Sequence, residues 1–145
     1  MTVTKPAPAP SVQSAERSDR RRWIALIAVC IGQLMIVLDT TIVNVALPAI
    51  QTDLHFSQAN LAWVIDGYLI TFGSLLLLAG RLGDLVGRKK VFLGGLVLFT
   101  FASLLCGFAQ SEAMLIGGRF LQGVGGAGAS AVIIAIIVTE FPEPA

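Results

Sequence analysis

Apolar residues are gathered into four long blocks, and polar residues fill the short stretches between them. The blocks cover residues Trp23–Leu47, Leu61–Ala79, Val91–Ala109 and Ala113–Val138. About 20 helical residues cross the roughly 30 Å hydrocarbon core of a bilayer, and each block is close to or above that length. Strands of a membrane β-barrel would be about ten residues long with alternating polarity, a pattern missing here. The sequence therefore predicts an all-α integral membrane protein with four transmembrane helices.

The composition supports this class. A soluble domain carries about a quarter of its residues as Asp, Glu, Lys and Arg, whereas the charged share here is 13% and the hydrophobic share is 55%. So few charges cannot cover a water-exposed surface. The chain is predicted to have the lipid bilayer as its solvent.

Positive charges are sorted between the two sides of the predicted spans. Of ten Lys and Arg residues, five precede the first block and four lie between the second and third blocks. The connections after the first and third blocks contain none. The positive-inside rule then places the N-terminus and the 80–90 loop in the cytoplasm. Residues 1–22 are predicted to be a disordered basic cytoplasmic tail whose end contacts anionic lipid headgroups.

Three charged residues lie inside the predicted spans: Asp39, Asp66 and Arg119. Each costs on the order of 3 kcal/mol at the bilayer centre. Counting helical rise, all three fall in the outer half at similar depths, so contact is expected if their helices share one interior. One arginine offsets one carboxylate, and a second acid kept from water favours its protonated form. The three are therefore proton-coupling candidates, with a solvated helix end as the alternative for Asp66 and snorkelling as that for Arg119.

Two polar residues near these charges are candidates for a substrate pathway. Asn44 follows Asp39 by five residues, and Gln122 lies one helical turn after Arg119. Gln122 has the reach to hydrogen-bond a substrate or Asp39, although simple packing in the bundle is an equal alternative.

Three motifs carry a family resemblance. The first block ends in Leu38-Asp39-Thr40-Thr41-Ile42-Val43-Asn44-Val45-Ala46-Leu47-Pro48, the next loop contains Gly80-Arg81-Leu82-Gly83-Asp84-Leu85-Val86-Gly87-Arg88-Lys89-Lys90, and the fourth block contains Arg119-Phe120-Leu121-Gln122-Gly123. In this order they resemble the major facilitator superfamily, and in particular its 14-helix drug:proton antiporters, over about residues 20 to 145. The resemblance implies that residues 23–145 form part of an N-terminal transmembrane domain, and that Arg119 takes part in proton coupling.

The loop motif supplies a second candidate site at the cytoplasmic side. Its glycines are expected to allow a tight turn and close approach of another helix, and its cations to anchor the next helix at the headgroups. The resemblance implies that Asp84 helps to hold the two halves of such a transporter together. The candidate latch comprises Gly80, Gly83, Asp84, Gly87, Arg88 and Lys89. Leu85 stands where the family usually has a basic residue, so the resemblance does not extend to one latch contact.

Several other activities are excluded. The run Gly123–Gly128 matches a Gly-x-Gly-x-x-Gly fingerprint, but that motif needs a preceding strand, and close helix packing explains these glycines better. His55 and Asp53 alone make no metal site. Cys30 and Cys106 lie at different depths, which is incompatible with a disulfide. No catalytic constellation is present, so we expect no enzyme, no cofactor and no nucleic-acid partner.

The leading hypothesis is part of a proton-coupled multidrug efflux antiporter, located as a multi-pass protein in the plasma membrane, which in bacteria is the inner membrane. Its expected partners are the bilayer, protons, a hydrophobic or cationic small molecule, and further C-terminal helices of the same protein. Two alternatives stay open: a self-contained four-helix exporter that works as an oligomer, and a non-transporting membrane subunit.

Overall fold

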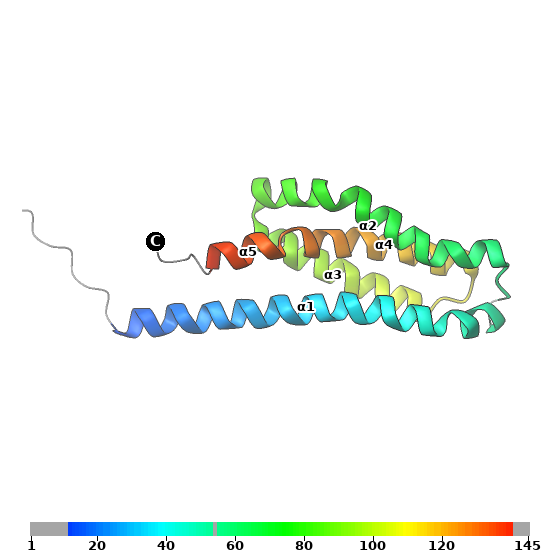
Figure 1. Cartoon of the computed structure of the whole chain (residues 1–145), viewed down its shortest axis with the longest axis horizontal. Helices are drawn as coiled ribbons and strands as arrows, with labels where there is room; N and C mark the ends of the chain where they lie inside the picture. The colour runs from blue at the N-terminus through cyan, green and yellow to red at the C-terminus, as the bar shows by residue number, and fades with distance from the viewer. Residues whose placement is uncertain (1–11, 54, 141–145) are drawn as a thin grey trace, which may run out of the picture.

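The computed structural model describes residues 12–53 and 55–140, and every element in those ranges is an α-helix (Figure 1). The elements are α1 (Val12–Asp53), α2 (Gln58–Val86), α3 (Arg88–Gly107), α4 (Glu112–Ala131) and α5 (Ile133–Glu140). Four stretches are long and apolar enough to cross a bilayer: Arg20–Asp53, Gln58–Val86, Arg88–Gly107 and Glu112–Thr139. The prediction of an all-α protein with four candidate spans is confirmed.

The helices run along one common long axis (Figure 1). The α1–α2 and α3–α4 connections lie at one end of the bundle. The α2–α3 turn lies at the other end, together with the start of α1 and the end of α5. Four spans therefore bring both ends of the described chain to the side on which the basic residues were predicted to face the cytoplasm.

Helix α4 forms the centre of the bundle because its small residues let two neighbours approach closely. A Cβ atom on Gly123 would lie 2.7 Å from the Tyr68 carbonyl oxygen of α2, and one on Gly125 would lie 2.5 Å from the Phe99 nitrogen of α3. Van der Waals packing between small residues is the main force that associates helices in lipid. The glycine-rich run is thus a two-sided packing surface inside a helix, as predicted, and the nucleotide-binding interpretation is excluded.

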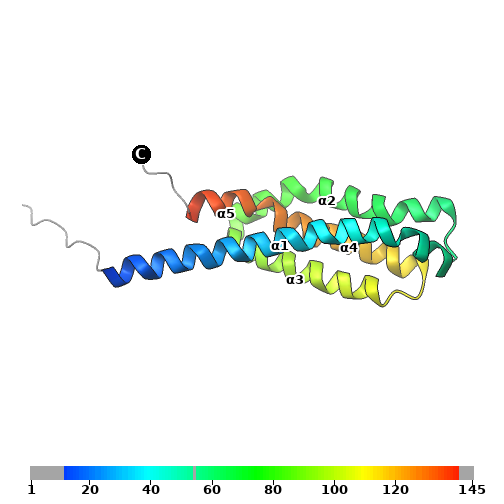
Figure 2. The same cartoon turned by 60° about the horizontal axis from the view of Figure 1, so that its bottom comes forward.

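Helix α1 lies along one side of the other helices (Figure 2). Its buried apolar residues include Val29 and Ile36, which join Phe92 and Phe99 of α3 in one cluster. Many of its other large side chains, such as Ile31 and Val45, are exposed. In a bilayer those exposed faces are available to lipid or to further helices.

The helix boundaries differ from the prediction at several points. Helix α1 begins at Val12, so residues 12–22 are helical rather than part of a disordered tail, whereas residues 1–11 lie outside the described residues. The stretch after Val12 contains no proline or glycine to interrupt a helix that continues into the apolar span. At its other end α1 continues past Leu47 to Asp53, with Pro48 inside the helix.

The predicted 80–90 loop is mostly helical. Helix α2 extends to Val86, so Gly80 and Gly83 lie within it, and the turn is confined to Gly87, whose φ is 112°. That left-handed conformation favours a residue without a Cβ atom. The fourth span is also interrupted, at Val132, which separates α4 from α5 and packs against Gly83 of α2. The interruption follows Ser130 and the glycine-rich run, a composition at which helices commonly bend.

The packing role of α4 gives a matched test. We expect Gly125→Ala to lower the melting temperature of the chain in detergent micelles, because the new methyl group would press on the α3 backbone at a cost of about 1–3 kcal/mol. Gly117→Ala on the same helix is the control, since nothing lies within 4 Å of its Cβ position. That change should be neutral or stabilising by up to about 1 kcal/mol through helix propensity. Equal effects of the two changes, measured by thermal unfolding, would contradict the packing assignment.

Candidate functional site

A buried ion pair joins α1 to α4. The Arg119 guanidinium donates to the Asp39 carboxylate, with 2.6 Å between Nη1 and Oδ2. The Arg119 side chain is 2% exposed and that of Asp39 is 13% exposed. A hydrogen-bonded pair at this depth offsets the cost of placing each charge in the bundle. Arg119 therefore does not snorkel outward, and the two charges lie at a common level as the depth argument expected.

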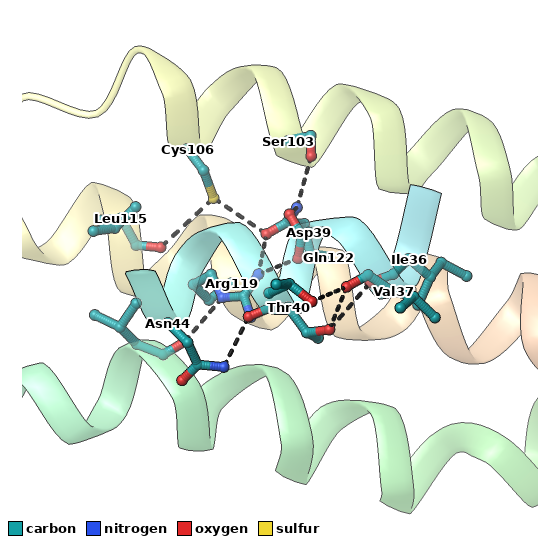
Figure 3. Close-up of polar contacts among 12 residues, drawn as sticks. Ile36, Val37, Asp39, Thr40, Asn44, Ser103, Cys106, Leu115, Arg119 and Gln122 are labelled. Atoms are coloured by element: carbon teal, nitrogen blue, oxygen red, sulfur yellow. Dashed lines mark hydrogen bonds and ion pairs between the residues drawn. The ribbon is translucent and has the colours of Figure 1, made fainter. Parts of the chain in front are cut away.

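Gln122 forms hydrogen bonds with both members of this pair. Its amide nitrogen donates to the second Asp39 oxygen (2.8 Å) and to the Ser103 hydroxyl of α3 (2.8 Å), while its amide oxygen accepts from Arg119 Nη1 (2.8 Å). Figure 3 shows these side chains converging from three helices. Both carboxylate oxygens of Asp39 are thus engaged. Among the alternatives left open for Gln122, the structure contains the hydrogen bond to Asp39.

Arg119 also contacts α2. Its Nε donates to the backbone carbonyl of Val64 at 2.9 Å. Its guanidinium carbon lies 4.6 Å from the centroid of the Tyr68 ring, within the range of a cation–π contact. One arginine side chain thereby contacts α1 and α2 directly, and it contacts α3 through Gln122 and Ser103.

Three members of this cluster were not identified from the sequence. Tyr68 is the single tyrosine of the chain, and its place inside an apolar span was the one available signal. Ser103 and Cys106 carry no motif, and only their spacing of three residues places them on one face of α3. The Cys106 sulfur lies 3.5 Å from the Gln122 amide oxygen (Figure 3).

The other candidates within the spans lie outside this cluster. Asp66 is exposed on α2, and its side chain has no ion pair or hydrogen bond with the described part of the chain. It lies eight residues after Gln58, about 12 Å into the helix, so it is not a helix-end residue. Asn44 is exposed and donates to the Thr40 carbonyl oxygen of its own helix.

The loop candidates form a smaller cluster at the α2–α3 turn. Arg88 donates to the Ala135 carbonyl oxygen of α5 (3.0 Å) and lies 3.4 Å from the Asp84 carboxylate. Asp84 is exposed and does not cap α3, which begins after Gly87 without a side-chain cap. Lys89 is exposed, and the Gly80 Cβ position has nothing within 4 Å. Gly83 differs from Gly80, because a Cβ atom there would lie 2.5 Å from the Val132 side chain at the α4–α5 junction.

A cleft of about 510 Å³ lies between α1, α2 and α4, in the half of the bundle that contains the α2–α3 turn. Its polar lining consists of Gln33, Arg81, Asp84 and Ser130, and the buried Ser130 hydroxyl has no partner within the described residues. The apolar lining includes Phe72 and Leu76. The cleft combines a mostly apolar wall with a few polar groups, the usual chemistry of a small-molecule site.

Metal chemistry has no support in the described part of the chain. Ranges 12–53 and 55–140 contain no group of three His, Cys, Asp or Glu side chains placed to hold a metal ion. Cys30 and Cys106 are both free.

Comparisons with known proteins identify the family of the chain. A family model for the Major Facilitator Superfamily matches residues 29–145. The uncharacterized MFS-type transporter EfpA of Mycobacterium tuberculosis is 43% identical over 96% of this chain and 29% of its own length. The puromycin resistance protein of Streptomyces alboniger is 45% identical over 87% of this chain and 25% of its own. The cephamycin export protein CmcT of Amycolatopsis lactamdurans is 43% identical over 82% of this chain and 24% of its own. The chain spans about a quarter of the length of these curated relatives.

The buried pair is tested by a double-mutant cycle of Asp39→Asn and Arg119→Gln. Each single change should destabilise the folded chain by about 3–5 kcal/mol, because it leaves one buried charge without its partner. The double change should cost less than the sum, with a coupling energy of about 1–3 kcal/mol measured by unfolding in detergent.

The exposed pair Asp84 and Arg88 provides the control cycle. Its coupling energy, from Asp84→Asn and Arg88→Gln, should stay below about 1 kcal/mol. Additive effects of the Asp39 and Arg119 changes would show that the two side chains do not interact.

Proposed function

Because the chain belongs to the major facilitator superfamily, we propose that it supplies the proton-coupling site of a transporter that exports hydrophobic or cationic small molecules. The observation that carries the proposal is the buried pair of Asp39 and Arg119, bridged by Gln122 between two membrane spans. An ionisable pair inside a membrane is costly and commonly marks a proton or substrate pathway. The function of the whole transporter, including its 14-helix architecture, is part of this proposal.

A proton can act on this pair through simple electrostatics. With Asp39 ionised, its carboxylate holds Arg119 and ties α1 to α4. Protonation converts the carboxylate into a neutral acid, so the guanidinium loses its counter-charge and the tie weakens. An arrangement of the helices in which the Asp39–Arg119 pair is formed and one in which it is broken would then differ in their affinity for the proton. That difference is the requirement for coupling proton movement to a conformational change.

Three charged residues share the proposed coupling role. Asp39 and Arg119 form the switch, while Asp66 is the second acid that one arginine leaves without an ionic partner. Gln122 positions the pair, and Asn44 lies one turn beyond Asp39 on the predicted outer side as a pathway candidate. The Asp84–Arg88 cluster is proposed as the cytoplasmic latch, since Arg88 already links the α2–α3 turn to α5.

Export of small molecules is the activity that the relatives favour. Two of them are described as a puromycin resistance protein and a cephamycin export protein, and both come from bacteria. We therefore propose a location in a bacterial plasma membrane, with protons as the coupling ion. The open cleft between α1, α2 and α4 is a reasonable entrance for an apolar compound, because its wall is mostly aliphatic and aromatic.

The proposal predicts that Asp39→Asn in the complete transporter abolishes proton-driven export without preventing membrane insertion. The amide cannot exchange a proton, so we expect proton movement linked to substrate to fall by at least about 100-fold, as for loss of an essential proton-transfer group. Proton flux driven by substrate in proteoliposomes is the measurement. Asp53→Asn, at the exposed end of α1, is the control and should leave the flux unchanged. Normal flux with Asp39→Asn would remove this residue from the coupling site.

A further inference from the structure

An apolar groove on the surface of the bundle has no part in the proton-coupling site. It lies between α2, α3 and α4, has a volume of about 420 Å³, and runs from Lys90 near the α2–α3 turn to Leu75 and Leu98. We propose that this groove binds one anionic phospholipid, with an acyl chain along its length and the phosphate at Lys90. The inference depends neither on the proton-coupling role nor on the exported compound.

The chemistry of the groove fits an acyl chain. Its α2 wall contains Leu78, Leu82 and Val86, all of which are exposed. Among the described residues, Lys90 is the one lining residue with a polar side chain. Water would find too few hydrogen-bond partners along this surface, whereas a hydrocarbon chain gains van der Waals contact over all of it. In a bilayer we therefore expect hydrocarbon to fill the groove.

The length of the groove matches one leaflet of the bilayer. On α2 it extends from Leu75 to Val86, which is about 16 Å of helix, and on α3 it extends from Lys90 to Leu98, about 12 Å. Half of the roughly 30 Å hydrocarbon core is about 15 Å. The groove therefore reaches from the headgroup level to near the middle of the bilayer, which is the depth of an acyl chain. A transmembrane helix would have to cross both leaflets.

Glycines give the groove its floor and its depth. A Cβ atom on Gly95 would lie 2.5 Å from the Ala129 nitrogen, so the α3 and α4 backbones meet beneath the groove. Gly94 also lines the groove, and nothing lies within 4 Å of its Cβ position. The space above Gly94 is therefore open to a ligand and is not used by the packing of the described helices.

The charge at the mouth of the groove favours an anionic headgroup. Lys90 is exposed and is the third residue of α3, at the predicted cytoplasmic surface. The acid of this region, Asp84, is two residues from both Leu82 and Val86, so it lies on the other side of α2, where it lines the cleft with Gln33. A lysine near the membrane surface favours an anionic lipid by about fivefold. Another helix laid over the groove would cover Lys90 and would need its own acid to pair with it.

The test uses the complete transporter in detergent micelles and measures the binding of phosphatidylglycerol and phosphatidylcholine with identical chains by native mass spectrometry. We expect phosphatidylglycerol to bind about fivefold more tightly than phosphatidylcholine. Lys90→Gln should remove this preference and leave phosphatidylcholine binding within about twofold, because that lipid has no net charge. Lys90→Arg keeps the positive charge and should keep the preference.

Gly94→Leu tests the groove itself. The leucine side chain would take the place of the acyl chain and should weaken the binding of both lipids by about tenfold or more, since one extra methylene in an apolar pocket can already cost that much. Gly73→Leu on α2 is the control, because its Cβ position also has nothing within 4 Å but lies outside the groove. That change should alter neither affinity by more than about twofold.

The outcomes separate a lipid site from its alternatives. Glycerophosphoglycerol, the headgroup without its chains, should not displace phosphatidylglycerol if the groove holds an acyl chain. Equal phosphatidylglycerol affinities in Gly94→Leu, Gly73→Leu and the unchanged protein would overturn the site, and so would a full preference for phosphatidylglycerol in Lys90→Gln. If another helix of the complete transporter covered the groove, Gly94→Leu would lower the melting temperature and leave lipid binding unchanged, which would also overturn it. None of these measurements involves export, so the proposed function can fail while the lipid site stands.

Discussion

One arginine that must be neutralised inside a membrane organises this bundle. Arg119 extends from α4 and reaches the Asp39 carboxylate of α1, the Val64 carbonyl oxygen of α2, and, through Gln122, the Ser103 hydroxyl of α3. Each of the four spans is therefore connected to a single charge. Because unpaired charge is costly in hydrocarbon, every helix arrangement open to the protein has to keep this guanidinium satisfied. Asp39 links α1 to this centre through two hydrogen bonds, one from Arg119 and one from Gln122.

Close packing of α4 is what makes such short polar connections feasible. Gly123 admits the α2 backbone and Gly125 admits the α3 backbone, so side chains as short as serine reach across the interface. Lipid supplies no hydrophobic drive between helices, and close contact together with interhelical hydrogen bonds has to hold them. Helix α1 lacks such a glycine interface with α4, and its attachment there depends more on Asp39.

The sequence predicted the number of spans, the burial of Arg119 and the common level of Arg119 and Asp39. Each follows from the free-energy cost of exposing a charged side chain or unpaired backbone groups to hydrocarbon. It placed Asp66 with them on depth alone, and depth does not specify the direction of a side chain around its helix. Ser103 and Tyr68 were missed for a related reason, since their roles arise only when α3 and α2 are packed against α4. The 80–90 segment was predicted to be a loop because its three glycines allow a tight turn, whereas most of it is helical. Only Gly87 adopts a backbone conformation that favours glycine.

The account depends on a direct contact between Asp39 and Arg119 in a bilayer, where their N–O separation is 2.6 Å in this structure. Solid-state NMR on the chain in lipid, with ¹³C-labelled aspartate and ¹⁵N-labelled arginine, measures that contact through the dipolar coupling of the carboxyl carbon to the guanidinium nitrogen. We expect a strong coupling at neutral pH that is lost with Asp39→Asn and retained with Asp84→Asn. The absence of an Asp39-dependent coupling in correctly inserted protein would contradict the account.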